Sequence, residues 1–342
     1  MTDSIRGITR RRTAKEFCYY SQTGRRLRDL SELGCIKSLV IPPAWQGVWI
    51  SPFPHSHLQA TGRDAKGRKQ YRYHPRWREI RDQTKYDRLI DFASSLPVIR
   101  RQLKRDLTRE GLCREKVLAT VVRLLEVSLI RVGNDEYARD NKSYGLTTMK
   151  NRHATVRGAK IKFQFRGKSG KEHIVEVEDR RVARIVRACQ DLPGQELFRY
   201  VDDEGQMHDI GSGDVNDYLR EITGRDFTAK DFRTWAGTIS VVCELQQLGP
   251  AELETEARKN VVAAIKATAQ SLGNTPAVCR KSYIHPAIIA AYLDGSLILK
   301  LNDWKGKTGS DSSCRLRPKE AAVRRFLKRA SDGRRKRVRS SN

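Results

Sequence analysis

The sequence predicts an α+β protein: a small N-terminal domain built on an antiparallel β-sheet, and a larger, mainly α-helical domain that carries a small β-sheet with a hairpin. Three observations favour this fold class. The chain has 342 residues, which corresponds to about two domains at roughly 150 residues each. Two stretches, 36–75 and 159–178, have the residue pattern of β-structure, and apolar residues recur at helical spacing from residue 114 onward.

The stretch 36–75 contains the signals of a small sheet. Residues 48–50 and 57–61 have the composition of short strands, and the strand pattern resumes at 70–74. Residues 62–67 predict a turn, because two glycines and an aspartate occur there. Residues 1–35 are polar and basic, and no element is assigned to them. The charged segment 76–110 is predicted to be helical and to be interrupted at Leu96-Pro97.

The second domain begins with a buried amphipathic helix at 114–130, where five apolar residues from Val117 to Leu129 recur at helical spacing. Gly133-Asn134 is its stop signal. In 159–178, apolar and polar residues alternate on both sides of a turn at 167–170, which predicts a hairpin. Most segments after 180 are predicted to be helical, including one at 252–272 that Gly273 can end.

The domain boundaries are placed by changes in composition. We expect an N-terminal β-rich domain at 1–92 and a mainly α-helical domain at 93–300. The segment 301–342 is expected to be a flexible basic tail, because residues 315–342 hold 12 Lys and Arg against 2 acidic residues.

The net charge of +27 predicts a polyanionic partner, and nucleic acid is favoured over a ribosomal or membrane-surface role. The sequence has no run of eighteen apolar residues and no apolar leader, so neither a membrane span nor secretion is expected. Seven scattered cysteines without a CxxC pair indicate reduced thiols and a cytoplasmic protein with no metal site. No cofactor is expected either, and the absence of a GxxxxGK(S/T) loop agrees with this. For His55-Ser56-His57, a turn and strand is favoured over a pair of metal ligands.

Two isolated cations stand out from the diffuse basic background. Arg131 follows the buried helix, where it is either a structural salt-bridge partner or an inward ligand for an anion. Lys168 is at the tip of the predicted hairpin between Gly167 and Gly170, which allow a partner to approach the backbone closely. Taken alone, it is equally a surface lysine in a turn.

Two predicted helix starts add further candidates. Thr228 and Asp231 have the spacing of a capping box, so Lys230 and Arg233 share the first turn of a helix whose free N–H groups favour a phosphate. A solvated helix start is the alternative. Thr275 can cap the next helix with Pro276 at its first position, which places Asn274 in the preceding link and Tyr283 about two turns further on.

The candidate residues of the two preceding paragraphs occur along the chain in the order Arg, Lys, Lys-x-x-Arg, Asn, Tyr. With this order, the sequence resembles the type IB DNA topoisomerases of the small poxvirus and bacterial kind. The resemblance extends from about 36 to about 295. Tyrosine recombinases share the catalytic order but not the N-terminal block. The most specific stretches are 41–45 (IPPAW) with Trp49-Ile50, 59–74 (QATGRDAKGRKQYRYH), 163–170 (FQFRGKSG), 230–234 (KDFRT) and Ser282-Tyr283.

The resemblance implies a role for each site residue. Tyr283 would be the nucleophile that forms a 3′-phosphotyrosine, with Arg131 and Arg233 stabilising the transition state. Lys168 would be the general acid, assisted by Lys230. Asn274 stands where many relatives carry histidine, so it would donate a hydrogen bond to a phosphate oxygen but hold no titratable proton.

The expected substrate is duplex DNA, preferably supercoiled, which a monomer would clamp, nick and reseal in the cytoplasm, at the nucleoid, without ATP or metal. A tyrosine recombinase and a non-enzymatic basic DNA-binding protein are the alternatives. For the tyrosines of 70–74, packing within the sheet is the alternative to DNA contact. The expected DNA-contact residues are Arg63, Lys66, Arg68, Lys69, Gln70, Tyr71, Tyr73 and Tyr137.

Overall fold

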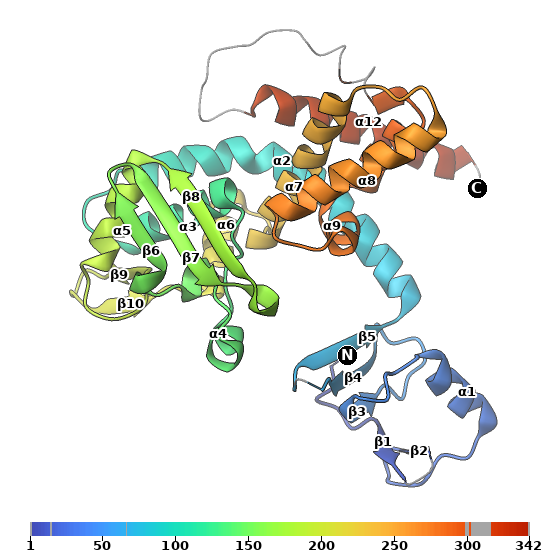
Figure 1. Cartoon of the computed structure of the whole chain (residues 1–342). Coiled ribbons are helices and arrows are strands. Elements are labelled where there is room, and N and C mark those ends of the chain that lie inside the picture. Colours follow the sequence, from blue (N-terminus) through green and yellow to red (C-terminus); the bar gives the residue numbers. More distant parts are fainter. Residues whose placement is uncertain (1, 14–15, 66, 298–300, 302–315, 341–342) are drawn as a thin grey trace. The chain divides into compact units, whose positions relative to one another are not determined.

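The computed structural model describes residues 2–13, 16–65, 67–297, 301 and 316–340. The chain forms two compact units, Met1–Tyr86 and Asp87–Asn342 (Figure 1). The first is built on an antiparallel sheet and the second is mostly helical, so the predicted fold class is confirmed. Within the described residues, no helix is both long and apolar enough to cross a membrane.

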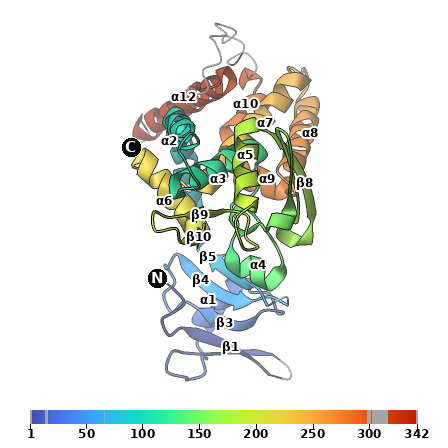
Figure 2. The same ribbon diagram turned by 90° about the vertical axis from the view of Figure 1, so that its left-hand side faces the viewer.

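The first unit contains a five-stranded antiparallel sheet with the strand order β2-β1-β3-β4-β5. Figure 2 labels β1, β3, β4 and β5 of this sheet. Its small core is formed by Ile8, Ile36, Val48, Ile50 and Ala60. The three strands predicted from the sequence correspond to β3, β4 and β5. The strands are β1 Ile8–Arg12, β2 Phe17–Tyr20, β3 Gln46–Ile50, β4 Leu58–Arg63 and β5 Lys69–Tyr73.

Three elements of this unit begin in the N-terminal region for which the sequence suggested no structure: β1, β2 and α1 (Leu30–Ser38). Helix α1 runs on to residue 38, so the start of the stretch 36–75, predicted as β-structure, is helical. Of the five residues of β1 only Ile8 is buried. The guanidinium of Arg10 lies 4.3 Å from the centre of the Phe17 ring and donates to the Trp45 carbonyl at 2.7 Å. A strand stabilised by arginine contacts has the composition of a solvated basic segment, which is why it was missed.

Helix α2 (Pro75–Asp106) is continuous through Pro97, so the predicted interruption was wrong. Proline inside a helix removes one backbone hydrogen bond. Leu96 and Ile99 are almost fully buried on either side, and Phe92 makes edge-to-face contact with Phe227 and Phe232 of the same unit. This packing keeps the helix together across the proline.

The core of the second unit is centred on α3 (Arg114–Ser128), which confirms the buried helix predicted at 114–130. Of the nine residues from Val117 to Leu125, all except Arg123 are buried, and α3 contacts α5, α6 and α7. Leu129 ends the helix in the left-handed conformation with φ 57°. The neighbouring helices are α4 Asp135–Asn141, α5 Arg180–Gln190, α6 Ser212–Thr223, α7 Ala229–Leu248 and α8 Glu254–Ser271.

The predicted hairpin is confirmed as β7 (Lys160–Arg166) and β8 (Glu172–Glu178), joined by a short 3₁₀ turn at Lys168–Gly170. Ile161, Phe163 and Phe165 are buried while their neighbours in β7 are exposed. β6 (Ala154–Arg157) completes a three-stranded antiparallel sheet. Further short elements are 3₁₀ turns at Leu146–Thr148 and Asn151–His153 and a second hairpin of β9 Arg199–Val201 and β10 Met207–Asp209.

The C-terminal part of the second unit contains α9 (Pro276–Tyr283), α10 (Pro286–Leu293) and α12 (Pro318–Ser340). A flexible tail was expected from 301 onward, but α12 packs against α7 and α10. Val323, Phe326 and Leu327 of α12 are buried. The apolar residues of this segment are spaced along one helix face, and its high charge concealed them.

Candidate active site

A cavity of about 380 Å³ in the second unit brings together the predicted catalytic residues. Its lining comes from the segment after α3, the hairpin turn, the start of α7 and the end of α9. Five of the six predicted catalytic residues line it, and so does the predicted DNA-contact residue Tyr137. The polar and charged residues that line this cavity include Arg131, Lys168, Lys230, Arg233, Tyr283, Asn134, Tyr137 and Tyr144.

Arg131 is positioned by the sharp end of α3. The left-handed Leu129 turns the chain away from the helix, and Gly133 continues the turn with φ 122°. One guanidinium nitrogen of Arg131 donates to Oδ1 of Asn274 at 2.5 Å. Arg131 forms no ion pair with a carboxylate among the described residues, so the structural salt bridge considered from the sequence is absent there.

Arg233 lies in the second turn of α7 and is only 4% exposed. Its guanidinium donates to the carbonyls of Leu129 and, at 2.6 Å, Leu272. Burial lowers the pKa of Arg233, and the positive charge of Arg131 lowers it further. An arginine nevertheless stays protonated in proteins. The two guanidinium groups therefore repel each other, and an anion bound between them would relieve that repulsion.

Tyr283 is the last residue of α9, whose start is formed as the sequence predicted. The Thr275 side chain accepts a hydrogen bond from the amide of Val278, and Pro276 is the first helical residue. The Tyr283 carbonyl accepts from Thr238 Oγ1 at 3.3 Å. The ring lies under the Arg233 guanidinium, 5.3 Å from ring centre to Cζ, which fixes the phenol beside the cation.

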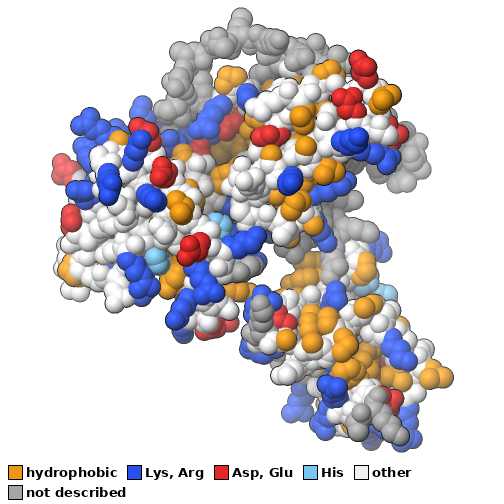
Figure 3. Space-filling view, in the orientation of Figure 1, with side chains coloured by type: hydrophobic (Ala, Val, Ile, Leu, Met, Phe, Trp, Pro, Cys, Tyr) orange, Lys and Arg blue, Asp and Glu red, His pale blue; other side chains and the backbone are white. Residues whose placement is uncertain are grey.

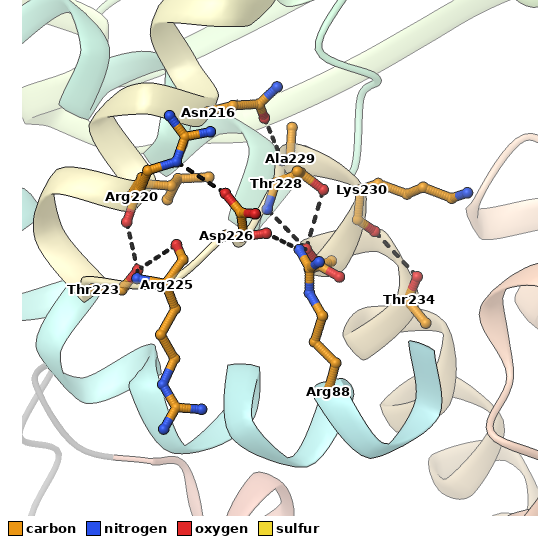
Figure 4. Close-up of polar contacts among 12 residues, drawn as sticks. Arg88, Asn216, Arg220, Thr223, Arg225, Asp226, Thr228, Ala229, Lys230 and Thr234 are labelled. Carbon is orange, nitrogen blue, oxygen red and sulfur yellow. Dashed lines mark hydrogen bonds and ion pairs between the residues drawn. The ribbon is translucent and has the colours of Figure 1, made fainter. Parts of the chain in front are cut away.

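The two lysines reach the cavity from exposed positions. Lys168 begins the 3₁₀ turn of the hairpin, and Gly170 ends it with φ 74°. Lys230 is the second residue of α7, and Figure 4 shows its side chain extending away from the polar cluster around Arg88. The Asp231 carboxylate accepts from the Thr228 amide at 2.8 Å, which is the predicted capping contact.

Asn274 does not line the cavity itself, but it accepts a hydrogen bond from Arg131, which does. Its backbone amide donates to the Ala269 carbonyl at 2.9 Å, which closes the tight link after α8. The Nδ2 group of Asn274 is buried and has no hydrogen-bond partner. A buried amide donor without a partner is costly, so this group is available for an acceptor that the free protein lacks.

Sequence reasoning missed three residues at or beside the site. Asn134 caps α4 by accepting from the Tyr137 amide at 2.9 Å, and its position before an acidic helix start could have indicated this. Tyr144 lies against His153, with ring centres 4.5 Å apart. His173 on β8 lines a second, smaller cavity that also touches Arg131 and Arg233. No local signal marks Tyr144 or His173.

The other predicted DNA-contact residues lie on the β4–β5 hairpin of the first unit, except Lys66, which is outside the described residues. Arg63 donates to the Gly67 carbonyl at 2.8 Å. Asp64 accepts from Arg68 at 2.7 Å and from Gln70 at 2.9 Å, while Lys69 pairs with Asp3 at 2.6 Å. Tyr71 is 45% exposed and stacks on Tyr73, which in turn stacks on Trp77.

The described residues contain no group of three or more His, Cys, Asp or Glu side chains placed to hold a metal ion. The six described cysteines are free thiols. Burial raises the pKa of the Cys279 thiol, which lies in α9 close to Arg233, to about 11. The charged side chains that line the candidate site are two arginines, Arg131 and Arg233, and two lysines, Lys168 and Lys230.

Comparison with known proteins gives the family. Residues 74–307 match the catalytic core of eukaryotic DNA topoisomerase I, and residues 16–64 match the N-terminal domain of bacterial DNA topoisomerase IB. The chain is 32% identical over 288 residues to DNA topoisomerase 1B of Acanthamoeba polyphaga mimivirus, covering 82% of this chain and 85% of the relative. It is 22% identical over 252 residues to DNA topoisomerase 1B of Vaccinia virus (strain Copenhagen), covering 71% and 75%.

The fold, the arginine-rich cavity with its tyrosine and these matches agree. The chain belongs to the type IB DNA topoisomerase family. It is thus an enzyme of the isomerase class whose substrate is DNA. Prominent Lys and Arg side chains on the viewed face of each unit fit a polyanionic substrate (Figure 3).

Proposed function

We propose that the chain relaxes supercoiled duplex DNA by cutting one strand through Tyr283 and rejoining it, with no ATP or metal. The observation that carries this proposal is the meeting of Arg131, Lys168, Lys230, Arg233 and Tyr283 at one cavity, although they are up to 152 positions apart in the chain. Family membership favours this function over a recombinase or a passive DNA-binding protein.

In the proposed cleavage step, the Tyr283 oxygen attacks the scissile phosphorus. A new phosphorus–oxygen bond forms to the tyrosine while the bond to the 5′ oxygen breaks. Negative charge accumulates on the non-bridging oxygens, where the guanidinium groups of Arg131 and Arg233 would stabilise it. The unpaired Nδ2 of Asn274 would supply one more hydrogen bond to a phosphate oxygen.

Proton transfer completes the step. Lys168 gives a proton to the departing 5′ oxygen, and Lys230 assists from the start of α7. The phenol gives up its own proton to solvent water, and nearby cations lower the free energy of that loss. Religation is the same step in reverse, so the covalent intermediate conserves the energy of the broken bond.

We further propose that a single copy of the chain is sufficient, since five of its six proposed catalytic residues meet at one cavity. The enzyme would act where its DNA substrate is, at the nucleoid in the cytoplasm. The N-terminal unit would add contacts to the same duplex from Arg63, Arg68, Lys69 and Tyr71. A preference for supercoiled substrate follows from the torsional energy that relaxation releases.

The test is relaxation of a supercoiled plasmid in EDTA without ATP, followed by trapping with denaturant. Wild type should relax the plasmid and leave a DNA–protein adduct, whereas Tyr283→Phe should do neither because it lacks the attacking oxygen. Tyr200→Phe on β9, outside the cavity lining, is the matched control and should behave like wild type. Intact supercoils with wild type, or full activity of Tyr283→Phe, would disprove the proposal.

A further inference from the structure

The imidazole ring of His173 lies between two glycines that directly precede residues of the proposed site. Gly167 precedes Lys168 in the hairpin turn, and Gly273 precedes Asn274 in the link between α8 and α9. A Cβ atom at Gly167 would lie 2.5 Å from Cδ2 of His173, and one at Gly273 would lie 2.6 Å from its Cε1. The ring therefore fills the space between the hairpin turn and the link.

Other contacts fix the orientation of this ring. It stacks on Phe165 of β7 with ring centres 5.4 Å apart and planes 15° from parallel. Phe165 is buried and belongs to the sheet, so it is a rigid support. A cavity of about 130 Å³ beside the ring is lined in part by Arg131 and Arg233.

The surroundings of the ring disfavour a positive charge on it. Burial lowers the pKa of His173, and the positive charges of Arg131, Arg233 and Lys171 lower it further. Phe165 and the two glycines, which lie beside the ring, carry no charge. Nε2 is buried without a hydrogen-bond partner, which costs about 1–3 kcal/mol. The contacts of the ring faces and edges, rather than hydrogen bonds, therefore keep His173 in place.

We propose that His173 is a positioning residue for DNA cleavage, whose ring sets the distance between the Lys168 turn and the Asn274 link. This inference rests on the proposed function, in which Lys168 must reach the 5′ oxygen of a phosphate held by the arginines and Asn274. Lys168 is exposed at a hairpin tip, where few contacts restrain the backbone. A displacement of about 1 Å can slow catalysis on the order of a hundredfold.

Two duplex oligonucleotides separate this role from a general structural one. Both carry a cleavage site mapped with wild-type protein, and they differ only in the scissile 5′ bridging atom, oxygen or sulfur. A leaving thiolate needs no proton, because a thiol has a much lower pKa than an alcohol. A variant that only misplaces the Lys168 general acid should therefore be slow on the oxygen substrate and nearly normal on the sulfur substrate.

Three variants are tested at saturating protein in single-turnover cleavage. His173→Ala removes the ring, whereas Gly167→Ala displaces it with a new Cβ atom. The alanine causes no backbone strain, because Gly167 has φ −96°, which any residue can adopt. Both should cleave the oxygen substrate about 10–100-fold more slowly, with less than about threefold loss on the sulfur substrate. His173→Phe keeps an aromatic plate on Phe165 and should regain most of the rate. His208→Ala, on the exposed β10, is the control and should match wild type.

Wild-type rates for both His173→Ala and Gly167→Ala on the oxygen substrate would overturn the inference. So would equal losses on the two substrates, because they would indicate damage to phosphate binding in general. If His173→Ala fails to fold, as judged by thermal unfolding, Gly167→Ala still decides the question with the histidine present. Failure of wild type to cleave either duplex would instead refute the proposed function itself.

Discussion

At the scale of single residues, the position of the proposed nucleophile, Tyr283, depends on Gly237 of α7. A Cβ atom there would lie 2.8 Å from the carbonyl oxygen of Tyr283 and 3.0 Å from its Cβ. Gly237→Ala must therefore push α9 away from α7, which carries Arg233. We expect DNA cleavage to slow about 10–100-fold, and the free energy of unfolding to fall by about 1–3 kcal/mol.

Single-turnover cleavage and urea unfolding measure the two effects. Gly213→Ala in the first turn of α6 is the control, because a Cβ at Gly213 meets no atom within 4 Å. Alanine favours the helix over glycine by up to about 1 kcal/mol, so this variant should be as stable as wild type or slightly more so. Wild-type cleavage by Gly237→Ala would mean that α9 can move without displacing the Tyr283 hydroxyl.

The residues that sequence reasoning placed well are those with local signals. Thr275 and Pro276 mark a helix start within a few residues, so the place of Tyr283 in α9 could be predicted. The contact between Arg131 and Asn274 could be expected only from the family resemblance, because 143 positions separate them. His173 could not be found at all, since Gly167 and Gly273 meet its ring only in the folded chain.

At the scale of elements, α2 is connected to the start of α7 by Arg88. Its guanidinium donates to the Asp226 carbonyl and, at 2.9 Å, to the Asp231 carboxylate that caps α7 (Figure 4). Because α7 presents Lys230 and Arg233, we expect Arg88→Ala to loosen that helix start. Cleavage should slow about tenfold, and stability should fall by about 1–3 kcal/mol, the usual contribution of hydrogen bonds to a charged group.

Arg220→Ala provides the control for Arg88→Ala. Arg220 also pairs with Asp226, at 2.9 Å, but it is 55% exposed. Exposed ion pairs contribute at most about 1 kcal/mol, so its loss should leave cleavage unchanged. Binding to uncleaved duplex should be near wild type for both variants. Equal effects of the two substitutions would show that Arg88 has no special role at α7.

The elements that could be predicted are those in which apolar residues recur so regularly that the element is recognised from the sequence without knowledge of tertiary contacts. This holds for α3 and for the β7–β8 hairpin. It fails for β1, whose last three residues are arginines, and for β2, whose four residues are too few to show a period. It fails also at Pro97, where burial of Leu96 and Ile99 outweighs the local preference of proline for ending a helix.

At the scale of the whole molecule, α12 joins the C-terminal end of the chain to the core of the second unit. Arg100 of α2 is buried between two carboxylates: it donates to Glu320 of α12 at 2.7 and 2.8 Å and to Glu126 of α3 at 2.8 Å. A flexible arm was predicted for 301–342 from its many charges, but composition does not show which of these charges are paired. Helix α12 is thus part of the same fold that holds the candidate site.

The last prediction concerns this buried ion pair. Burial alone would raise the pKa of Glu320, but the hydrogen bonds and charge of Arg100 outweigh it and hold the pKa below 4.5. The stabilisation by Glu320 is therefore fully present above about pH 4.5 and is lost as the pH falls through its lower folded pKa. Glu320→Gln should lower the free energy of unfolding at pH 7 by on the order of 3 kcal/mol, because Arg100 loses a buried partner.

Urea unfolding at several pH values tests this prediction, because the difference between wild type and Glu320→Gln should shrink below about pH 4.5 as the wild-type carboxylate takes up its proton. A chain ending at Gly333 is the control: it keeps Glu320, Phe326 and Leu327 but lacks the basic run 334–337. It should be as stable as wild type at every pH, yet bind DNA with a smaller salt dependence, because fewer counterions are released. A difference between wild type and Glu320→Gln that stays constant from pH 7 to pH 3 would mean that the Glu320 charge does not hold α12 in place.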